Sequence, residues 1–370
     1  MKVAVFGYPQ RIGVVLDDFH AVVDLNLAYA TYLSEKQNEA KPYAKANAVL
    51  PASLSEFLAV GDVALKAAEE TLQEFVLPRL EAGGVSSISG PSGEKVAYRS
   101  PSEIKLPSPP IPSLSSRIFC AAMNFPSHVL ALRRNQGDKA VTIEALTKEM
   151  KAKQIYGFCK LPQTIVGNDT TLNVPRWVKF LDYELELAAY VGKKGGGIID
   201  GKASPITRRE AKEMIVGYAC FNDWSVRDES LIVGYEPLDQ STLNFTLRKN
   251  IAGGSLGPYL VIGEKINPYV LESTTRVNGK ARQNGSLAEM VNKFEDLIVY
   301  LSRFITLYPG DIIASETVSG TALDSTRQTA DARSKGDVRV LDDSLFLKDG
   351  DLVEGTISEI GTLRNRIHFV

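Results

Sequence analysis

Three carboxylates near the middle of the chain have the residue types and spacing of a metal site. Glu184 and Glu186 lie in the segment 182–187, Asp-Tyr-Glu-Leu-Glu-Leu, in which polar and apolar residues alternate. This alternation predicts a β-strand that carries both carboxylates on one face. Adjacent like charges repel one another unless a cation neutralises them. Together with Asp223, which ends a second apolar run, the two glutamates would give a hard divalent cation an all-oxygen site.

Acidic residues at alternate positions are also typical of the solvated face of an edge strand. The face that carries the two glutamates continues into Val178 and Phe180 on one side and into Ala188 and Tyr190 on the other. A face that is apolar at both ends does not have the pattern of a plain solvated surface. This continuation favours the metal site. The alternation alone is also compatible with a solvated edge strand.

The elements that must position these residues fall on both sides of a proline-rich segment, residues 106–113. Its prolines predict a stiff connector. We therefore expect a small N-terminal α+β domain with the connector, residues 1–113, and a larger catalytic domain, residues 114–370. In the first part the pattern predicts strands at 3–6, 12–16, 21–25 and 95–99 and helices at 26–37 and 53–80.

After the connector the sequence predicts many short strands and few crossover helices. The fold class that this pattern indicates is α+β, mainly β, with mixed sheets rather than a doubly wound sheet. Residues 138–154 are charged and helical in character and could cover a site. Thr207 and Glu210 form a capping box that opens a short helix. We expect strands at 117–123, 156–160, 164–166, 178–191, 217–221, 259–263 and 274–277, a helix at 287–307 and a loop at 320–337.

The composition excludes several classes of protein. The chain has 370 residues, 44% of them hydrophobic, and a net charge of −2, which is an ordinary globular composition. A nearly neutral surface argues against nucleic acid or an anionic membrane as a partner. No apolar run approaches a membrane span, and Arg11 follows the first strand too soon for a signal peptide. Three cysteines without metal-ligand spacing indicate reduced thiols in a cytoplasmic protein.

Several segments, taken in their order, resemble the motifs of the fumarylacetoacetate hydrolase family. The likeness covers roughly residues 117–370, and the N-terminal part fits less well. Each motif alone is weak, but the ordered set is specific for the family. The matching segments are Cys120 to His128, Phe158-Cys159-Lys160, residues 182–187 with Val191-Gly192-Lys193, Gly217 to Asp228, Val277-Asn278-Gly279 with Gln283, and Pro309-Gly310-Asp311.

The resemblance implies a β-rich roll of mixed sheets, usually in a dimer. The family's members act on 2-oxo acids and 1,3-diketo acids, and they hydrolyse C–C bonds, decarboxylate, isomerise or dehydrate with Mg²⁺ or a similar ion. By this likeness Glu184, Glu186 and Asp223 are the metal ligands, with Mn²⁺ or Ca²⁺ as alternative ions. We therefore expect a cytoplasmic catabolic enzyme that forms a homodimer and acts on a small 2-oxo or diketo acid.

The same likeness assigns roles around the metal. His128 is the candidate general base, because an imidazole titrates near working pH; alternatively it caps the following helix. Lys160 and Lys249 are the other catalytic candidates, with Arg248 competing for the position of Lys249. Arg227 would hold substrate oxygens or pair with Asp228. The remaining candidates for substrate contact are Asn124, Ser230, Glu316 and Thr317.

Three positions depart from the family's pattern. Ala131 stands where many members have a glutamate that forms a water-activating dyad with the histidine. Ser230 replaces a glutamine, and Glu316 replaces the glycine before Thr317. The glutamate would add negative charge near an anionic substrate unless a cation compensates it. The metal motif is therefore intact while its surroundings are altered, as in a divergent member of the family.

These observations lead to ranked expectations for function. The first is an Mg²⁺-dependent hydrolase that cleaves a C–C bond in an acylpyruvate or a related 1,3-diketo or 2-oxo acid. The alternative is a lyase or isomerase acting on a 2-oxo acid such as oxaloacetate or a 2-keto-3-deoxy sugar acid. Ala131 motivates the alternative, because those reactions need no activated water. A third possibility, motivated by the divergent pocket, is a non-catalytic homologue that keeps the metal for structure.

Overall fold

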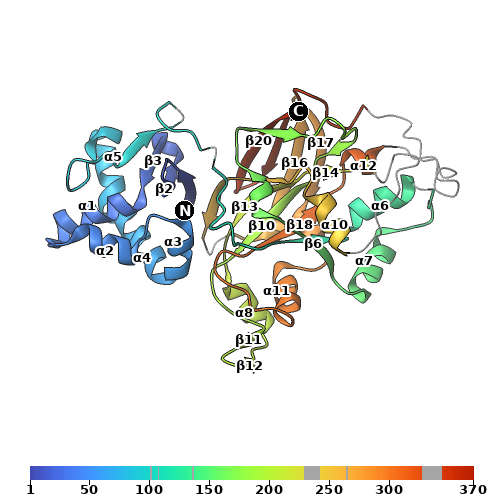
Figure 1. Cartoon of the computed structure of the whole chain (residues 1–370), viewed down its shortest axis with the longest axis horizontal. Helices are drawn as coiled ribbons and strands as arrows, with labels where there is room; N and C mark the ends of the chain where they lie inside the picture. The colour runs from blue at the N-terminus through green and yellow to red at the C-terminus, as the bar shows by residue number, and fades with distance from the viewer. Residues whose placement is uncertain (101, 107, 136, 229–241, 264–265, 327–343) are drawn as a thin grey trace.

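A large mixed sheet runs through the molecule and joins the N-terminal part to the rest (Figure 1). The computed structural model describes residues 1–370 apart from 101, 107, 136, 229–241, 264–265 and 327–343. In order across the sheet, the strands are β4 (Ala97–Arg99), β3 (Ala21–Asp24), β2 (Arg11–Leu16), β1 (Lys2–Phe6), β15 (Gly254–Ile262), β13 (Ile215–Asp223), β10 (Leu185–Val191), β18 (Ile312–Thr317), β5 (Ile118–Ala122) and β6 (Tyr156–Lys160), with β7 (Ile165–Val166) paired to β15.

A second sheet packs against the first and encloses part of the core. Leu185 and Leu187 of β10 belong to the same buried cluster as Ile357 and Leu363 of the second sheet. The sheets approach so closely that a Cβ at Gly355 would lie 2.6 Å from Leu185. The second sheet is formed, in order, by β17 (Lys280–Ser286), β16 (Glu272–Val277), β19 (Leu352–Ile357), β20 (Gly361–Phe369) and β8 (Thr170–Val174); the two short pairs are β9 (Leu181–Asp182) with β14 (Ser225–Val226), and β11 (Ile198–Ile199) with β12 (Lys202–Ala203).

The helices lie in two groups along the chain. The first group and the strands beside it share one buried cluster with Ala188, Phe221 and Leu256 of the large sheet. The first group is α1 (Leu25–Gln37), α2 (Pro42–Val49), α3 (Leu54–Val60), α4 (Asp62–Thr71) and α5 (Leu77–Gly83). The second is α6 (Pro126–Asn135), α7 (Ile143–Ala152), α8 (Arg208–Glu213), α10 (Thr242–Lys249), α11 (Phe294–Ser302) and α12 (Ala322–Ser325).

Short helical turns complete the described elements. They are η1 (Asp17–Phe19), η2 (Leu72–Val76), η3 (Val85–Ser87), η4 (Pro162–Thr164), η5 (Pro268–Val270) and η6 (Leu287–Glu289). Mixed sheets combined with helices confirm the predicted fold class. The division at residue 113 stays a prediction, although β1 pairs with β15 across it.

Several sequence-based element predictions need correction. The helix predicted at 287–307 is the short turn η6 followed by α11. Between them the N–H groups of Val291 and Asn292 donate to Asn124, which lies far away in the sequence. Because these N–H groups bond Asn124 and not carbonyls of the preceding turn, no continuous helix forms between η6 and α11. The strand predicted at 178–191 is likewise two strands, β9 and β10, whereas the capping box of Thr207 and Glu210 is present as predicted.

We expect Gly253→Ala to destabilise the fold next to the carboxylates. Gly253 has φ +63°, and an added Cβ would lie 1.9 Å from the carbonyl oxygen of Thr164. The left-handed conformation alone costs a residue with a side chain about 1–2 kcal/mol. Thermal unfolding should therefore shift down by several degrees. Gly263→Ala is the control, because a Cβ there meets no described atom within 4 Å; equal stability of the two variants would contradict the prediction.

Candidate metal centre and catalytic site

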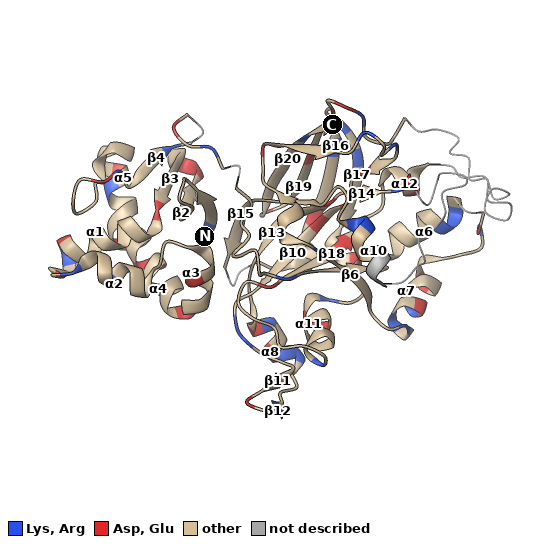
Figure 2. Cartoon of the chain, viewed as in Figure 1, with Lys and Arg blue, Asp and Glu red and all other residues tan. Residues whose placement is uncertain are grey.

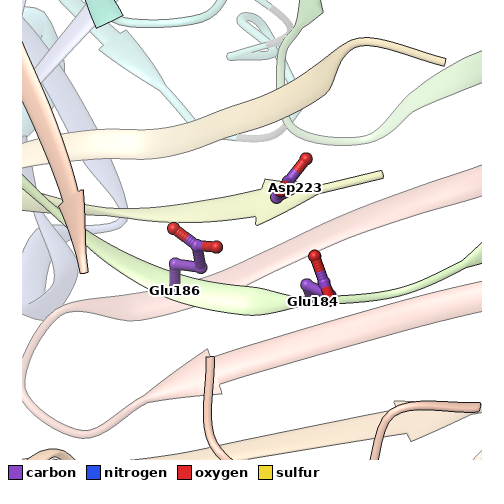
Figure 3. Close-up of side chains that lie close together, drawn as sticks. All are labelled: Glu184, Glu186 and Asp223. Carbon is purple, nitrogen blue, oxygen red and sulfur yellow. The ribbon is translucent and has the colours of Figure 1, made fainter. Parts of the chain in front are cut away.

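The three carboxylates predicted to bind a metal converge on one buried point (Figure 3). Glu184 precedes β10 and Glu186 lies on it, whereas Asp223 ends the neighbouring strand β13. The backbone N–H of Asp223 donates to the carbonyl of Glu184 at 2.9 Å, which brings the two chains together. One oxygen from each side chain lies within 4.8 Å of the others, and all three residues are buried. Because β10 lies between β13 and β18, the solvated edge-strand interpretation is wrong.

The chemistry of this donor set fits a divalent cation. Burial and the charges of Asp223 and Glu184 raise the pKa of Glu186 well above its ordinary value. Burial also opposes ionisation of Glu184, but Arg227 and Lys249 outweigh it and hold its pKa well below the ordinary value. Buried like charges of this kind are stable when a cation neutralises them, and carboxylate oxygens are the donors that Mg²⁺ and Mn²⁺ accept.

Three basic side chains, those of Lys160, Arg227 and Lys249, pair with the carboxylates. In the ribbon coloured by residue type, acidic and basic segments occur close together near β18 and α10 (Figure 2). The ammonium of Lys249 lies 2.9 Å from Glu184, 2.6 Å from Asp223 and 2.6 Å from the hydroxyl of Ser225. This contact favours Lys249 over its competitor Arg248. Charges of Asp223 and Glu184 outweigh burial and raise the pKa of Lys249, so it stays cationic.

Lys160 and Arg227 also pair with carboxylates of the protein. The Lys160 ammonium lies 2.6 Å from the other oxygen of Asp223 and donates to three backbone carbonyls. Arg227 bonds both Asp182, at 3.1 Å, and Glu184. Its alternative partner Asp228 instead accepts the N–H groups of residues 179 and 180, so the predicted Arg227–Asp228 pair is not formed. Contact of these cations with substrate stays a prediction.

His128 is bound to a carboxylate that the sequence pattern did not reveal. Its Nδ1 lies 2.8 Å from Asp324 on α12, and both residues are buried. The N–H of Gly320 donates to both oxygens of Asp324, at 3.0 and 2.9 Å, which orients the carboxylate. Burial lowers the pKa of His128, but the hydrogen bond and charge of Asp324 outweigh it, so the pKa is raised. Glu316 and Glu184 are close enough to raise it further.

Asp324 could have been suspected from one local signal. Thr321 accepts the N–H of Asp324 through its hydroxyl, as an N-cap residue does, so residues 321–325 form a helical turn within the predicted loop. Its pairing with His128, 196 residues away, is a tertiary contact without a local pattern. Asp182 was missed as a partner of Arg227 for the same reason.

Two of the predicted substrate contacts, Glu316 and Thr317, lie on β18 beside Glu186 of β10. Thr317 is buried and bonds Gln283 and the carbonyl of Leu185, so its hydroxyl is engaged within the protein. Asn124 bonds the carbonyls of residues 292 and 315 at 3.1 Å each. Ser230 lies outside the described residues. Glu316 directs its carboxylate toward three backbone N–H groups, those of residues 123, 124 and 125.

The segment predicted to cover the site contains α7. Leu146 and Met150 of α7 pack with Val129 of α6 in a small apolar cluster. A cavity of about 390 Å³ lies between these helices and β6, bordered by Met123 and Asn292. Movement of this segment stays a prediction.

We expect removal of one carboxylate to abolish metal binding. In the unaltered protein, Mg²⁺ or Mn²⁺ at about 100 times its dissociation constant should stabilise the fold by about 2.7 kcal/mol. Glu186→Gln should lose this rise in melting temperature and the binding heat in calorimetry. Glu295→Gln, which alters a buried carboxylate bonded to Tyr269 elsewhere, should keep both. Equal metal binding by the Glu186 variant would refute the site.

Comparisons with known proteins show which family the chain resembles. Residues 117–368 match the family described as fumarylacetoacetate (FAA) hydrolase C-terminal. Oxaloacetate tautomerase YisK of Bacillus subtilis is 30% identical over 359 residues, which cover 96% of this chain and 95% of that protein. No helix among the described residues is long and apolar enough to cross a membrane.

Two solved structures show the same fold over the full length. The fumarylacetoacetate hydrolase of Exiguobacterium antarcticum aligns with a TM-score of 0.60 and 24% identity, covering 100% of both chains. The maleylpyruvate hydrolase of Sphingobium sp. SYK-6 aligns with a TM-score of 0.60 and 19% identity, also covering 100% of both chains.

Proposed function

Because the chain belongs to the fumarylacetoacetate hydrolase family, whose members are enzymes, we propose that it is a divalent-metal-dependent tautomerase of a 2-oxo acid. Oxaloacetate is the first candidate substrate. The observation that carries the proposal is the buried His128–Asp324 pair beside three clustered carboxylates. The relative named as an oxaloacetate tautomerase supports it, because the likeness extends over almost the whole chain.

A divalent cation held by Glu184, Glu186 and Asp223 would polarise the 2-oxo group and neutralise the charge of an enolate. The protein's own contribution is the base. With Nδ1–H donating to Asp324, the lone pair of His128 is on Nε2. His128 takes a proton from C3 as the C–H bond breaks and its electron pair forms the enolate. The imidazolium then returns the proton to the C2 oxygen, and Asp324 stabilises the imidazolium in between.

The charges around the carboxylates support the need for a cation before an anionic substrate binds. Four buried carboxylates, at residues 182, 184, 186 and 223, face three basic side chains, at residues 160, 227 and 249. With all four carboxylates ionised, this set is short of one positive charge, and the carboxylate of Glu316 is close enough to Glu186 to add to the repulsion. An anionic 2-oxo acid would be repelled from such a site without a metal ion.

A C–C bond hydrolase is the second candidate, and the His128–Asp324 pair favours it. Asp324 supplies the carboxylate partner that Ala131 does not, so the pair could activate water. Solvent labelled with ¹⁸O separates the candidates. A hydrolase acting on a 1,3-diketo acid incorporates one label into the carboxylate formed by cleavage, whereas a tautomerase leaves the carbon skeleton intact. We further propose Mg²⁺ as the ion and a cytoplasmic homodimer as the working form.

We expect the protein to accelerate keto–enol exchange of oxaloacetate, seen as loss of the enol's ultraviolet absorbance. Removal of divalent ions with a chelator should abolish the acceleration, and Mg²⁺ or Mn²⁺ should restore it. A panel of 2-oxo and 1,3-diketo acids tests the range of substrates. Cleavage of a diketo acid without any effect on oxaloacetate would favour the hydrolase instead.

The role of His128 predicts the dependence of the rate on pH. The base must be neutral, so the rate should fall as the pH drops through the raised pKa of His128. Asp324→Asn removes the charge that raises this pKa, so the acid limb should move to lower pH. The same change should lower kcat roughly 10²-fold or more, because the ring loses its orientation and tautomer.

A matched control exists at the surface. His368 bonds Asp349 at 3.0 Å in a similar but exposed pair. Asp349→Asn should leave both the pH limb and kcat unchanged. An unshifted acid limb in the Asp324 variant would exclude His128 as the base.

A further inference from the structure

Glu316 lies at the end of β18, beside the turn that leads into α6. The parallel strands β18 and β5 are neighbours, with Ala314 opposite Cys120. Their ends therefore bring Glu316 to the turn 123–125, which precedes the helix that carries His128.

The Glu316 carboxylate fills a cluster of backbone donors. One oxygen lies 2.5 Å from the N–H of Met123; the other lies 2.7 Å from that of Phe125 and also accepts that of Asn124. Successive N–H groups of a turn that point to one side, as those of residues 123–125 do before α6, form a concavity that attracts anions. The carboxylate thus takes the place of a bound anion in the turn before α6, and the residue is buried.

The backbone of the same residue contacts the metal cluster. The N–H of Glu316 donates to Glu186 at 3.2 Å. Glu316 has φ +71° and Met123 has φ +57°, conformations that residues with side chains rarely adopt. Such backbone persists where surrounding bonds hold it, and it is typical of functional sites.

The three N–H groups explain why a carboxylate stands here. Glu316 is buried, so its charge needs hydrogen-bond partners, and its two oxygens accept all three N–H groups. A neutral side chain with one acceptor oxygen would leave part of this cluster without an acceptor.

We propose that Glu316 is a positioning residue, an internal anion that holds the start of α6, and with it His128, in a set position relative to Glu186. The inference rests on the proposed role of His128 as the base.

The test replaces the internal anion by an external one. Glu316→Gly suits φ +71° and opens space for formate. The variant should remain folded by circular dichroism, with kcat reduced about 100-fold because the base is misplaced and KM changed much less. Formate should raise its kcat and melting temperature with saturation, and formamide, neutral and of similar size, should not. Formate should do neither in the unaltered protein.

A second readout does not depend on turnover. The chain has three histidines, so ¹⁵N signals of the imidazole rings can be assigned singly. The signal of His128 should shift in the variant and return with formate, while those of His20 and His368 stay unchanged. A restored melting temperature without recovery of kcat or of the His128 signal would overturn the positioning role, as would full kcat in the variant without formate.

The two proposals fail differently. If the unaltered protein turns over no 2-oxo or diketo acid, the proposed function fails, but formate binding and the His128 signal still test the position of the ring. If the unaltered protein is active and the variant's His128 signal does not move, the positioning role alone fails.

Discussion

The structure depends on keeping ionised carboxylates out of water at the junction of β10 and β13. A buried charge is stable only when partners of opposite charge and hydrogen-bond donors surround it, and loss of one partner typically costs about 3–5 kcal/mol. Lys160, Arg227 and Lys249 supply those partners. They come from β6, the segment after β14, and α10, so these three segments must be in place beside β10 and β13 for the cluster to exist.

The contacts that hold the base and those that hold the carboxylate cluster meet at two residues, Glu316 and Asp182. The carboxylate of Asp182 accepts the N–H groups of Ala322 and Leu323 on α12. Asp324 fixes the ring of His128 from α12, whereas the cluster is built on the large sheet. Glu316 bonds both, through its side chain to the turn before α6 and through its backbone to Glu186. The two parts of the site are therefore linked by direct hydrogen bonds. This arrangement gives a rigid frame for proton transfer, in which small errors of position are costly.

Local pattern predicted the part of the site that lies at the start of β10 and at the end of its neighbour β13. Alternation placed Glu184 and Glu186 together, because the side-chain period of a strand is a property of the backbone. The partnership of His128 with Asp324 had no such signal, since the two residues meet only after folding. The same limit explains the helix predicted at 287–307, where hydrogen bonds to Asn124 override helical propensity. The mixed-sheet fold was predicted from the order of many motifs along the chain, each of which is weak alone.

The pairing of β1 with β15 has a consequence for the integrity of the molecule. Lys2 and Val3 cover the flank of a strand whose other side bonds β13, the strand that ends at Asp223. A chain clipped after its first few residues would leave backbone donors and acceptors of β15 exposed, and such a flank is a template for association with other chains. Pairing with the amino-terminal strand β1 thus keeps this side of β15 from serving as such a template.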